Sequence, residues 1–529
     1  MPAKTPKVAP GLVAYVAAGP GDLELLSVRA VDLLSKAQVV VADAGTAAVI
    51  NTYASEGAQV SYAVDEAGNA LTASARGRLV VDASKSGARV VRLLAGDANL
   101  DALVASEVSA VNKAGLPFEI VPAASSIFAT PAYAGFTLAG GGVRNVAILD
   151  AETVADWSAY AGSDTAVVLT NAAAKLNTAA KALIAAGRDP QTPVAVIHHG
   201  TSVDHESMVS DLGEIAGASR PAASWADGTV FISDSISQRE QMTWFENRPL
   251  LGWRILIPRT RDDIEDAVET LRRLGATCVE VPTISVEPPR TPQQMERAIH
   301  SIETGRYEWV VFTSPHAVRA VKEKLDEYGL DTRTFAGMKV AAIGESTLAA
   351  LDAIGIRPDL VPAGEQTTAA LLEEWPEFSS HEDPINRVFI PKADVATENL
   401  SDGLTARGWE VEDVVAYRTV RAAPPAADIR DAIKSGGYDA VLFTSASTVR
   451  NLVGIAGKPH ASTVIACIGP ATAEAAIEHG LRVDVQAAEP TVPSLITTLS
   501  EYVVSMREQN EDSLWRPSRR KAGARRKPN

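Results

Sequence analysis

Two Thr-Ser pairs and two Gly-x-x-Thr motifs end strand-like runs in the C-terminal half of the chain. Thr313–Ser314 and Thr444–Ser445 each close an apolar run before a helical stretch, and the other two motifs end at Thr347 and Thr472. Glycine lets a ligand approach the backbone, and a hydroxyl can cap the following helix or donate outward. Because the start of a helix presents N–H groups and a positive dipole end, each position could bind an anion. Any one of them alone is more often an ordinary helix cap, but the doubled set predicts a site for a large ligand with several carboxylates.

The doubled motifs belong to a longer internal repeat. The segments starting at Arg254 (RILIPR), at Val310 (VVFTSPHAVRAV) and near Gly344 (VAAIGESTLAAL) return in the same order 125 to 133 residues later. Each copy holds about three strand–helix units, which is enough for one small doubly wound domain. The VEPP and RAAPP stretches mark where the chain would cross between the copies. We therefore expect two similar lobes with a cleft between them.

The N-terminal half shows the same alternation of strand-like and helical segments, so the fold class is predicted to be α/β with mostly parallel sheets. A break near residues 245–253 separates the two halves. The predicted strands of the N-terminal half are 12–19, 38–43, 89–96, 117–123, 144–150, 165–170 and 193–200.

Length and charge set further limits. A chain of 529 residues is too long for one core, so we expect two to four domains. The tail from Arg516 contributes +7 to a net charge of −16, which leaves −23 on residues 1–515 and argues against nucleic-acid binding by the body of the protein. We expect residues 505–529 to be a disordered, solubilising basic tail; contact with a polyanion is the alternative. Cys278 and Cys467 are expected to be buried core thiols.

No run of apolar residues is long enough to span a bilayer, and the N-terminal residues lack the apolar core of a secretory signal. The sequence therefore predicts a cytoplasmic protein that does not associate with membranes.

Residues 253–504 carry a series of motifs: VVFTSPHAV, IGESTLAAL, VAYRTV, AVLFTSAS, IGPATAEAAIEHGL and AAEPTVPSLITTL. In their order and spacing, these motifs resemble the uroporphyrinogen-III synthase family. The resemblance implies two doubly wound parallel-sheet lobes, the first built from 253–288 with 421–504 and the second from 289–420. It also implies cyclisation of hydroxymethylbilane to uroporphyrinogen III, with loss of water and inversion of ring D, and without a metal or cofactor.

Such an enzyme would work mainly by folding a flexible polyanion into a reactive geometry and by stabilising charge with fixed dipoles. By motif matching, Tyr417 is the candidate that assists departure of the hydroxyl group; the alternative is a tyrosine that packs at the hinge. The candidate substrate-binding hydroxyls are Ser314, Thr347, Ser445 and Thr472. Three cations could pair with substrate carboxylates, although exposed cations are common: Arg259, Lys392 and Arg418.

The N-terminal half carries another series of motifs: VAAGPGDLELLSVRAVDLL, VVVAD, VVRLLAGD, GLPFEIVPAASS and TPVAVIHHGT. These motifs are similar to those of the tetrapyrrole methylases, specifically uroporphyrinogen-III C-methyltransferase. The similarity implies a domain over 11–245, with lobes at about 11–122 and 123–245, that binds S-adenosylmethionine. The matching cofactor positions are Pro20, Gly96, Asp97, Ser126 and Ile127, with Asn171 where the family usually has methionine.

The departures from that family all fall on the substrate side. Ala44 follows Asp43 where the family has arginine, and Asp65 and Glu66 stand where cations are expected. Two further loops have lost their basic and aromatic residues, and carry Asn99, Asp101 and Leu103 in one and Leu138, Ala139, Gly140 and Gly141 in the other. Since arginines bind carboxylates through two hydrogen bonds, their loss should weaken the binding of uroporphyrinogen.

Three hypotheses follow from the two resemblances. The first is an active synthase fused to a methylase half that is vestigial, regulatory or structural. The second is a bifunctional enzyme that also methylates uroporphyrinogen III, and the third is a sensor of a tetrapyrrole or S-adenosylmethionine with both sites inactive. The families further imply hydroxymethylbilane synthase as the upstream partner and a homodimer through the methylase-like half.

Overall fold

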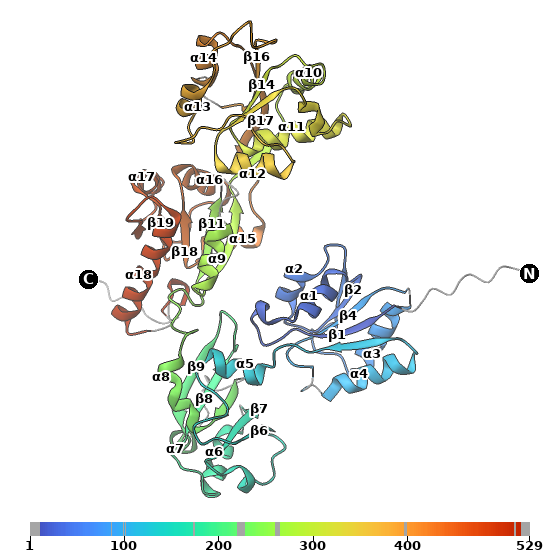
Figure 1. The fold of residues 1–529 in the computed structure, drawn as a ribbon. Helices are drawn as coiled ribbons and strands as arrows, with labels where there is room; N and C mark the ends of the chain where they lie inside the picture. Colours follow the sequence, from blue (N-terminus) through green and yellow to red (C-terminus); the bar gives the residue numbers. More distant parts are fainter. Residues whose placement is uncertain are drawn as a thin grey trace, which may run out of the picture. The chain divides into compact units, whose positions relative to one another are not determined.

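The computed structural model describes residues 11–85, 87–98, 100, 102–172, 175–218, 228–259, 265–395, 399–512 and 515–519. Its contacts divide the chain into two units (Figure 1). Unit 1 comprises Met1–Ile255, Asp266–Cys278 and Leu499–Arg519, and unit 2 comprises Leu256–Glu265, Val279–Thr498 and Arg520–Asn529. The helices and strands confirm the predicted α/β class, with four five-stranded sheets.

The first sheet of unit 1 is entirely parallel and has helices on both faces. Its strand order is β3-β2-β4-β1-β5. Alternate residues of β1 enter two different apolar cores, so Ala14 and Val16 pack with the helices of one face and Val13 and Tyr15 with those of the other. The elements are β1 (Val13–Ala17), β2 (Val39–Ala42), β3 (Gln59–Tyr62), β4 (Val90–Leu94), β5 (Phe118–Val121), α1 (Val28–Ser35), α2 (Ala47–Tyr53), α3 (Ala73–Ser84) and α4 (Ala102–Lys113).

The second sheet of unit 1 is an exception to the mostly parallel pairing that the sequence predicts and that the other sheets show. In the order β6-β7-β10-β8-β9, only β6 and β7 are parallel. The connection 199–205 between β8 and β9 is too short for a crossover helix, so those strands form an antiparallel pair. The elements are β6 (Asn145–Asp150), β7 (Thr165–Thr170), β8 (Pro193–His198), β9 (Glu206–Asp211), β10 (Thr229–Ile232), α5 (Ser126–Tyr133), α6 (Leu176–Ala185), α7 (Leu212–Gly217) and α8 (Arg239–Met242).

The other two sheets are formed mainly by unit 2, in the orders β12-β11-β18-β19-β20 and β13-β17-β16-β14-β15. Corresponding strands of the sequence repeat pair in the same way, β14 with β15 and β18 with β19, both parallel. The strands are β11 (Arg254–Arg259), β12 (Thr277–Pro282), β13 (Ile284–Glu287), β14 (Trp309–Phe312), β15 (Lys339–Ala342), β16 (Arg387–Ala393), β17 (Glu410–Arg421), β18 (Ala440–Phe443), β19 (Val464–Cys467) and β20 (Val485–Gln486).

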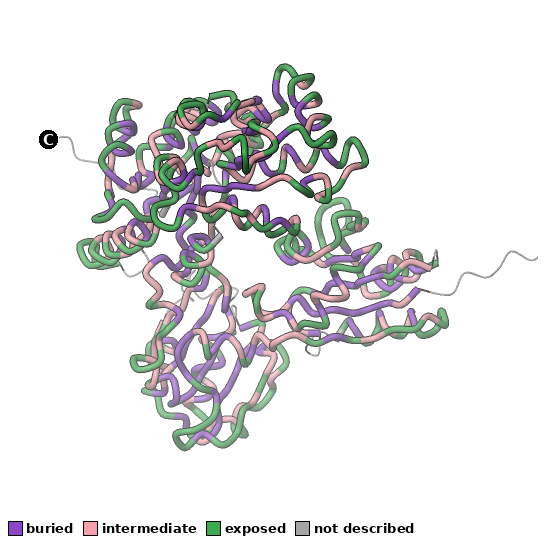
Figure 2. The backbone as a smooth tube through the Cα atoms, turned by 45° about the horizontal axis from the view of Figure 1, so that its top comes forward, coloured by how far each residue is buried: buried purple, intermediate pink, exposed green. Residues whose placement is uncertain are grey.

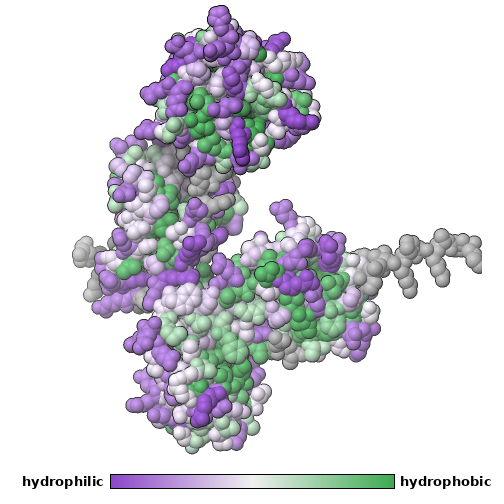
Figure 3. Space-filling model, viewed as in Figure 1, coloured by the Kyte–Doolittle hydropathy of each residue, from purple (hydrophilic) through white to green (hydrophobic). Residues whose placement is uncertain are grey.

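Helices join these strands, and buried strand cores run through both sheets (Figure 2). Hydrophilic side chains are spread over the visible face of residues 289–420 (Figure 3). The helices are α9 (Glu265–Arg273), α10 (Pro292–Glu303), α11 (Pro315–Glu327), α12 (Glu345–Ala353), α13 (Thr368–Glu374), α14 (Asn399–Ala406), α15 (Ala427–Ser435), α16 (Ala446–Ala456), α17 (Pro470–Glu478) and α18 (Val492–Asn510). Among the described residues, no helix combines the length and apolar character needed to cross a bilayer.

One lobe boundary differs from the prediction. Strand β13, placed by the sequence in the 253–288 segment, pairs antiparallel with β17, and Ile284 lies opposite Arg421. The two segments that were expected to cross between lobes are therefore bonded to each other, because both run extended through the same crossing. The ion pair between Glu287 and Arg418, which face each other in this register, ties the two strands further.

The C-terminal tail is also partly ordered, contrary to the prediction for 505–529. Helix α18 continues to Asn510, and beyond it the ring of Trp515 lies 6.0 Å from that of the buried Trp253. Arg516 donates a hydrogen bond to the carbonyl of Gly252. The basic composition of the tail predicted disorder, but Trp515 and Arg516 pack against Trp253 and Gly252, in the segment that connects the two halves of the chain. Residues 520–529 lie outside the described part of the chain.

The two cysteines differ in burial. Cys467, on β19, is fully buried, and burial raises the pKa of its thiol to about 12. Cys278 is only partly buried, which corrects the expectation of two buried core thiols.

We expect the native protein to react with thiol reagents at Cys278 and not at Cys467. Only the thiolate is nucleophilic, and Cys467 is both protonated at neutral pH and inaccessible. Mass spectrometry of peptides after brief alkylation checks this, with alkylation in denaturant as the control in which both react. Native labelling of Cys467 would show that β19 is not the closed core strand described here.

Candidate active site

Helices α11 and α12 begin side by side in the sequence repeat's first copy, each directly after a buried strand. Ser314 caps α11, and its hydroxyl accepts the N–H of Ala317 at 3.2 Å, while Pro315 fills the first helical position. Helix α12 follows Gly344, whose φ of 92° and ψ of 139° suit glycine. The N–H of Gly344 donates to Gln366 Oε1 at 3.1 Å. The motifs predicted to form anion sites therefore do start helices.

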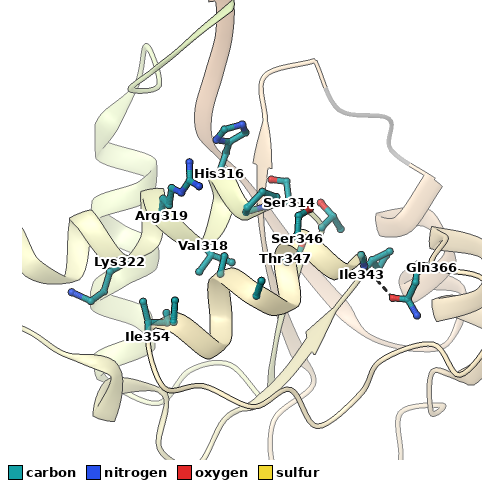
Figure 4. A pocket seen from close by; sticks show the side chains of 16 residues that line it. Ser314, His316, Val318, Arg319, Lys322, Ile343, Ser346, Thr347, Ile354 and Gln366 are labelled. Carbon is teal, nitrogen blue, oxygen red and sulfur yellow. Dashed lines mark hydrogen bonds between the residues drawn. The ribbon is translucent and has the colours of Figure 1, made fainter. Parts of the chain in front are cut away.

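A cavity of about 790 Å³ lies along these two helices (Figure 4). Helix α11 contributes basic side chains, and α12 contributes small and apolar ones. The amides of Glu345 and Ser346 stand in the first turn of α12, where a helix supplies no acceptor. The lining residues are Thr313, Ser314, Pro315, His316, Val318, Arg319, Lys322, Ile343, Gly344, Ser346, Thr347, Ala349, Ala350, Ala353, Ile354 and Gln366.

Tyr417 is joined to this cavity through Ser314. Its hydroxyl lies 2.9 Å from Ser314 Oγ, and its ring centroid lies 5.6 Å from that of His316. The side chain is 7% exposed. The register between β16 and β17 shifts at Lys392/Ala393, so that Ala416 is an extra residue directly before Tyr417. A bulge re-aims the following side chain, which explains how a strand residue reaches the start of α11.

The second copy of the motifs does not line this cavity. Ser445 caps α16 in a capping box with Thr448, and its hydroxyl also contacts Ser447 at 2.8 Å. Thr472 is 4% exposed in the first turn of α17. The structure thus brings together Ser314, Tyr417 and the buried Thr347. Ser445 and Thr472 stay predictions.

Each of the three cations predicted to bind carboxylates has an acidic partner in the protein. Arg259 is 3.1 Å from Glu280, and Lys392 pairs with Asp413. Arg418 pairs with Glu287 and donates to the carbonyl of Pro288 at 3.2 Å. Binding of substrate by any of them would require exchange of that partner, and their role stays a prediction.

Sequence reasoning missed three side chains that do line the cavity: His316, Arg319 and Lys322. They follow FTSP at steps of three residues on one helix. That spacing was visible in the sequence, but only the position of α12 shows which side of α11 faces the cavity.

The two glycines that precede α12 and α17 give a matched prediction. Gly344 has a φ of 92°, whereas Gly469 has a φ of −178°, which any residue adopts, and an added Cβ there would meet Pro490 at an ordinary 3.7 Å. We expect Gly344→Ala to lower the free energy of unfolding by about 1–3 kcal/mol. Gly469→Ala should change it by less than about 0.5 kcal/mol. Denaturant unfolding of the two variants checks this, and equal effects would contradict the strained geometry at Gly344.

The predicted cofactor positions of unit 1 follow three neighbouring strands. Pro20, Gly96 and Ser126 come after the carboxyl ends of β1, β4 and β5, which are adjacent in the sheet. Gly19 and Gly96 form an isolated bridge, and an added Cβ at Gly96 would meet nothing within 4 Å. Ligands of open α/β sheets bind at such an edge. Asp97 adjoins Gly96 in the same loop.

The remaining two cofactor predictions lie against the second sheet. Ile127 is 1% exposed and belongs to the apolar core formed with Phe136 and Phe231, so a ligand could meet only its backbone. Asn171 follows β7 with a φ of 51°, and its amide donates to Asp150 at 3.1 Å.

A buried charge network supports the Gly96 loop. Arg92 on β4 is fully buried and contacts Glu107 of α4 at 2.8 Å and Asp43 at 2.6 Å. The other oxygen of Asp43 accepts the N–H of Ala95 at 3.1 Å. Burial opposes the charge on Arg92, but the two carboxylates outweigh it and raise the pKa of the guanidinium. Asp43 therefore links the buried Arg92 to the backbone of Ala95, directly before Gly96.

The residues that differ from the methylase pattern around the expected substrate site are acidic or apolar. Asp65 organises an exposed turn by accepting the N–H groups of Asn69 at 2.8 Å and Ala67 at 3.0 Å, bonds that lower the pKa of its carboxyl. Leu103 is 41% exposed. Asn99 and Asp101 lie outside the described residues. Within the described ranges, no group of three or more His, Cys, Asp or Glu side chains could hold a metal ion.

Comparison with known proteins gives one family for each half. Residues 265–497 match the family model described as uroporphyrinogen-III synthase HemD, and residues 12–216 match the tetrapyrrole (corrin/porphyrin) methylases. A porphyrin biosynthesis protein HemD from Ruminiclostridium josui is 27% identical over 504 residues, which are 93% of this chain and 98% of that protein. The similarity to this relative therefore extends through both halves.

Two further similarities concern methyltransferases. A uroporphyrinogen-III C-methyltransferase from Bacillus subtilis (strain 168) is 27% identical over 363 residues, covering 66% of this chain and 74% of that protein. A crystal structure of uroporphyrin-III C-methyl transferase from Thermus thermophilus, complexed with S-adenyl homocysteine, is 24% identical with a TM-score of 0.36. It covers 43% of this chain and 93% of that chain.

Proposed function

Because the chain is a fusion of a tetrapyrrole methylase domain (12–216) with a uroporphyrinogen-III synthase domain (265–497), we propose that it converts hydroxymethylbilane into uroporphyrinogen III. The observation that carries this proposal is the hydroxyl pair of Ser314 and Tyr417 beside the cavity along α11 and α12. A buried phenol bonded to a helix-capping hydroxyl is a group that can hold or transfer a proton at a defined atom.

In the proposed reaction, the terminal hydroxyl of the substrate leaves as water with a proton from Tyr417. The electron pair of the pyrrole nitrogen forms the azafulvene, which the substituted position of ring D attacks. The spiro intermediate then fragments and closes with ring D inverted, and the Tyr417 phenolate takes up the ring proton whose loss restores the pyrrole. Ser314, which is bonded to Tyr417 and to the first turn of α11, holds the phenol in place throughout.

The main contribution of the protein would be to hold the flexible, multiply charged hydroxymethylbilane in one conformation that can cyclise. The first-turn amides of α12 and the hydroxyls of Ser346 and Thr347 offer neutral donors for carboxylate oxygens. Fixed donors of this kind require no reorganisation during the reaction, which favours the charge-separated azafulvene state.

The test is the isomer formed from hydroxymethylbilane, because closure without enzyme yields the type I isomer. Full-length protein should give uroporphyrinogen III in a proportion that rises with enzyme concentration. Type I product alone, from protein whose unfolding transition shows it to be folded, would reject the proposal.

We further propose that the methylase half binds S-adenosylmethionine but does not methylate uroporphyrinogen III at a normal rate. In support, the backbone at Gly96 is open, and the loops after β1, β4 and β5 are adjacent. Pro20, Gly96, Asp97 and the backbone at Ser126 and Ile127 would hold the cofactor, which supplies an activated methyl group. On the substrate side, Asp65 and exposed Leu103 offer no cation to a carboxylate.

Calorimetric titration with S-adenosylmethionine tests the first part, and mass spectrometry of product from uroporphyrinogen III tests the second. Methylated product at a rate comparable to cyclisation would favour the bifunctional alternative. Absence of both cyclisation and methylation, with cofactor binding retained, would favour a sensor. Hydroxymethylbilane synthase as the supplying enzyme, and a homodimer through the methylase half, are part of the same proposal.

A further inference from the structure

Three basic side chains of α11 line the cavity in a row. His316, Arg319 and Lys322 follow one another at three-residue steps, each of which advances about 4.5 Å along the helix. Figure 4 shows the three side chains on successive turns of α11. Lys322 also contacts the exposed Asp326 at 2.5 and 2.6 Å, a pair that a bound anion can replace.

The part of the cavity lining that α12 supplies, beside α11, is mostly apolar and has small side chains. Helix α12 presents Ala349, Ala350, Ala353 and Ile354 to the same cavity. This wall lets a flat ring lie against the helix, because alanine side chains do not protrude. An apolar surface beside a row of cations matches a pyrrole ring that carries carboxylates along its edge.

We propose that Arg319 and Lys322 bind the acetate and propionate groups along one edge of the tetrapyrrole while its pyrrole faces lie on the alanines of α12. This inference rests on the proposed function, since it assigns the substrate of that site to particular side chains. Arg319 and Lys322 would then be specificity-determining residues that select a substrate by the carboxylates along its edge. The Ser314–Tyr417 pair would carry out the proton transfer.

Helix α11 supplies its own control for the effect of charge. Lys324 lies on the same helix and pairs with Glu327 at 2.7 Å, but it does not line the cavity. Lys324→Gln therefore removes the same charge from the same helix without touching the row. A general electrostatic effect would appear in this variant too.

The experiment is a titration of full-length protein with uroporphyrin, the oxidised fluorescent macrocycle that keeps all the carboxylates. We expect Arg319→Gln combined with Lys322→Gln to raise the Kd at least about tenfold, and Lys324→Gln to change it less than about twofold. The wild-type protein should bind more weakly at about 1 M salt, where screening is strong. Kinetically, the double variant should raise KM for hydroxymethylbilane with little change in kcat.

A second variant changes the part of the cavity lining that α12 supplies. Ala349→Glu places a carboxylate on the exposed face of α12 that lines the cavity, and should raise the Kd for uroporphyrin about tenfold by repulsion. Ala349 is an exposed position of a helix, so Ala349→Glu should fold normally. This variant can therefore test the site even if the double variant of α11 is unstable.

Uroporphyrin binding by the double variant and by Ala349→Glu within about twofold of wild type would overturn the inference. If the protein forms type III product while binding is unaffected, the inference falls and the proposed function stands. If only type I product forms while the double variant loses uroporphyrin binding, the proposed function falls and the assignment of the row stands.

Discussion

Replacing Tyr417 by phenylalanine should lower kcat for type III formation about 100-fold and leave the fold intact. The change removes only the hydroxyl that bonds to Ser314 at 2.9 Å and that we propose as the proton donor. Positioned general acids contribute about 10²–10⁴-fold to rate, which sets the expected loss. Isomer-resolved kinetics of the purified variant measure it.

The matched control is Tyr307→Phe. Tyr307 is also a buried tyrosine of the 289–420 lobe, but its hydroxyl donates to Glu412 at 2.8 Å, whereas that of Tyr417 contacts Ser314, which lines the cavity. Both variants lose one buried hydrogen bond, so both should lose about 1 kcal/mol of stability. Equal activity of the two variants would mean that Tyr417 only packs at the hinge.

A double-mutant cycle tests whether Ser314 and Tyr417 act as a unit. Ser314→Ala alone should reduce the rate by less than Tyr417→Phe, because the phenol remains. Added to Tyr417→Phe, it should reduce the rate little further. Fully multiplicative losses would contradict the idea that the pair acts through one shared hydrogen bond.

Replacing Glu107 by glutamine should destabilise the first sheet of unit 1 by about 3–5 kcal/mol. Arg92 is fully buried, and Glu107 is its closest fully buried acidic partner at 2.8 Å. Removing the charge of Glu107 leaves Asp43 alone to compensate two buried guanidinium groups, Arg92 at 2.6 Å and Arg76 at 3.8 Å, in a medium that solvates them poorly. Asp43 would remain, but its carboxylate also holds Ala95.

Hydrogen exchange resolved by mass spectrometry can measure this loss in the full chain. Peptides of β1 and β4 report on unit 1, and peptides of β14 and β16 report on unit 2 in the same sample. The control is Asp82→Asn, which breaks an exposed pair with Lys85 and should cost less than about 0.5 kcal/mol. Unchanged exchange of β4 in Glu107→Gln would show that the network adds nothing to stability.

The strands of the fold were largely predictable because buried parallel strands are short apolar runs. All seven runs proposed for the N-terminal half contain strands, whereas β3, β9 and β10 were missed. Strand β3 is exposed along its length, and its only two apolar residues, Val60 and Tyr62, are too few to mark a strand. Pairing direction was not readable, since β8 and β10 have the composition of parallel strands but pair antiparallel.

The site was predictable only in part, because a sequence motif identifies candidate residues but does not show which residues lie next to them in the fold. The repeat pointed to Ser314 and Thr347, which do line one cavity. The contact of Ser314 with Tyr417 depends on a bulge in β17, and no local sequence pattern predicts that bulge. The cations chosen from the sequence do not line this cavity, whereas Arg319 and Lys322, which do, became candidates only once α12 was placed beside α11.

The isomer composition of the product is the most direct test of the account. Full-length protein is incubated with hydroxymethylbilane without S-adenosylmethionine, the macrocycle is oxidised, and the uroporphyrin isomers are separated. We expect type III uroporphyrin from wild type, and we expect Tyr417→Phe to shift the product towards type I. Type I uroporphyrin alone from folded wild-type protein would contradict the account.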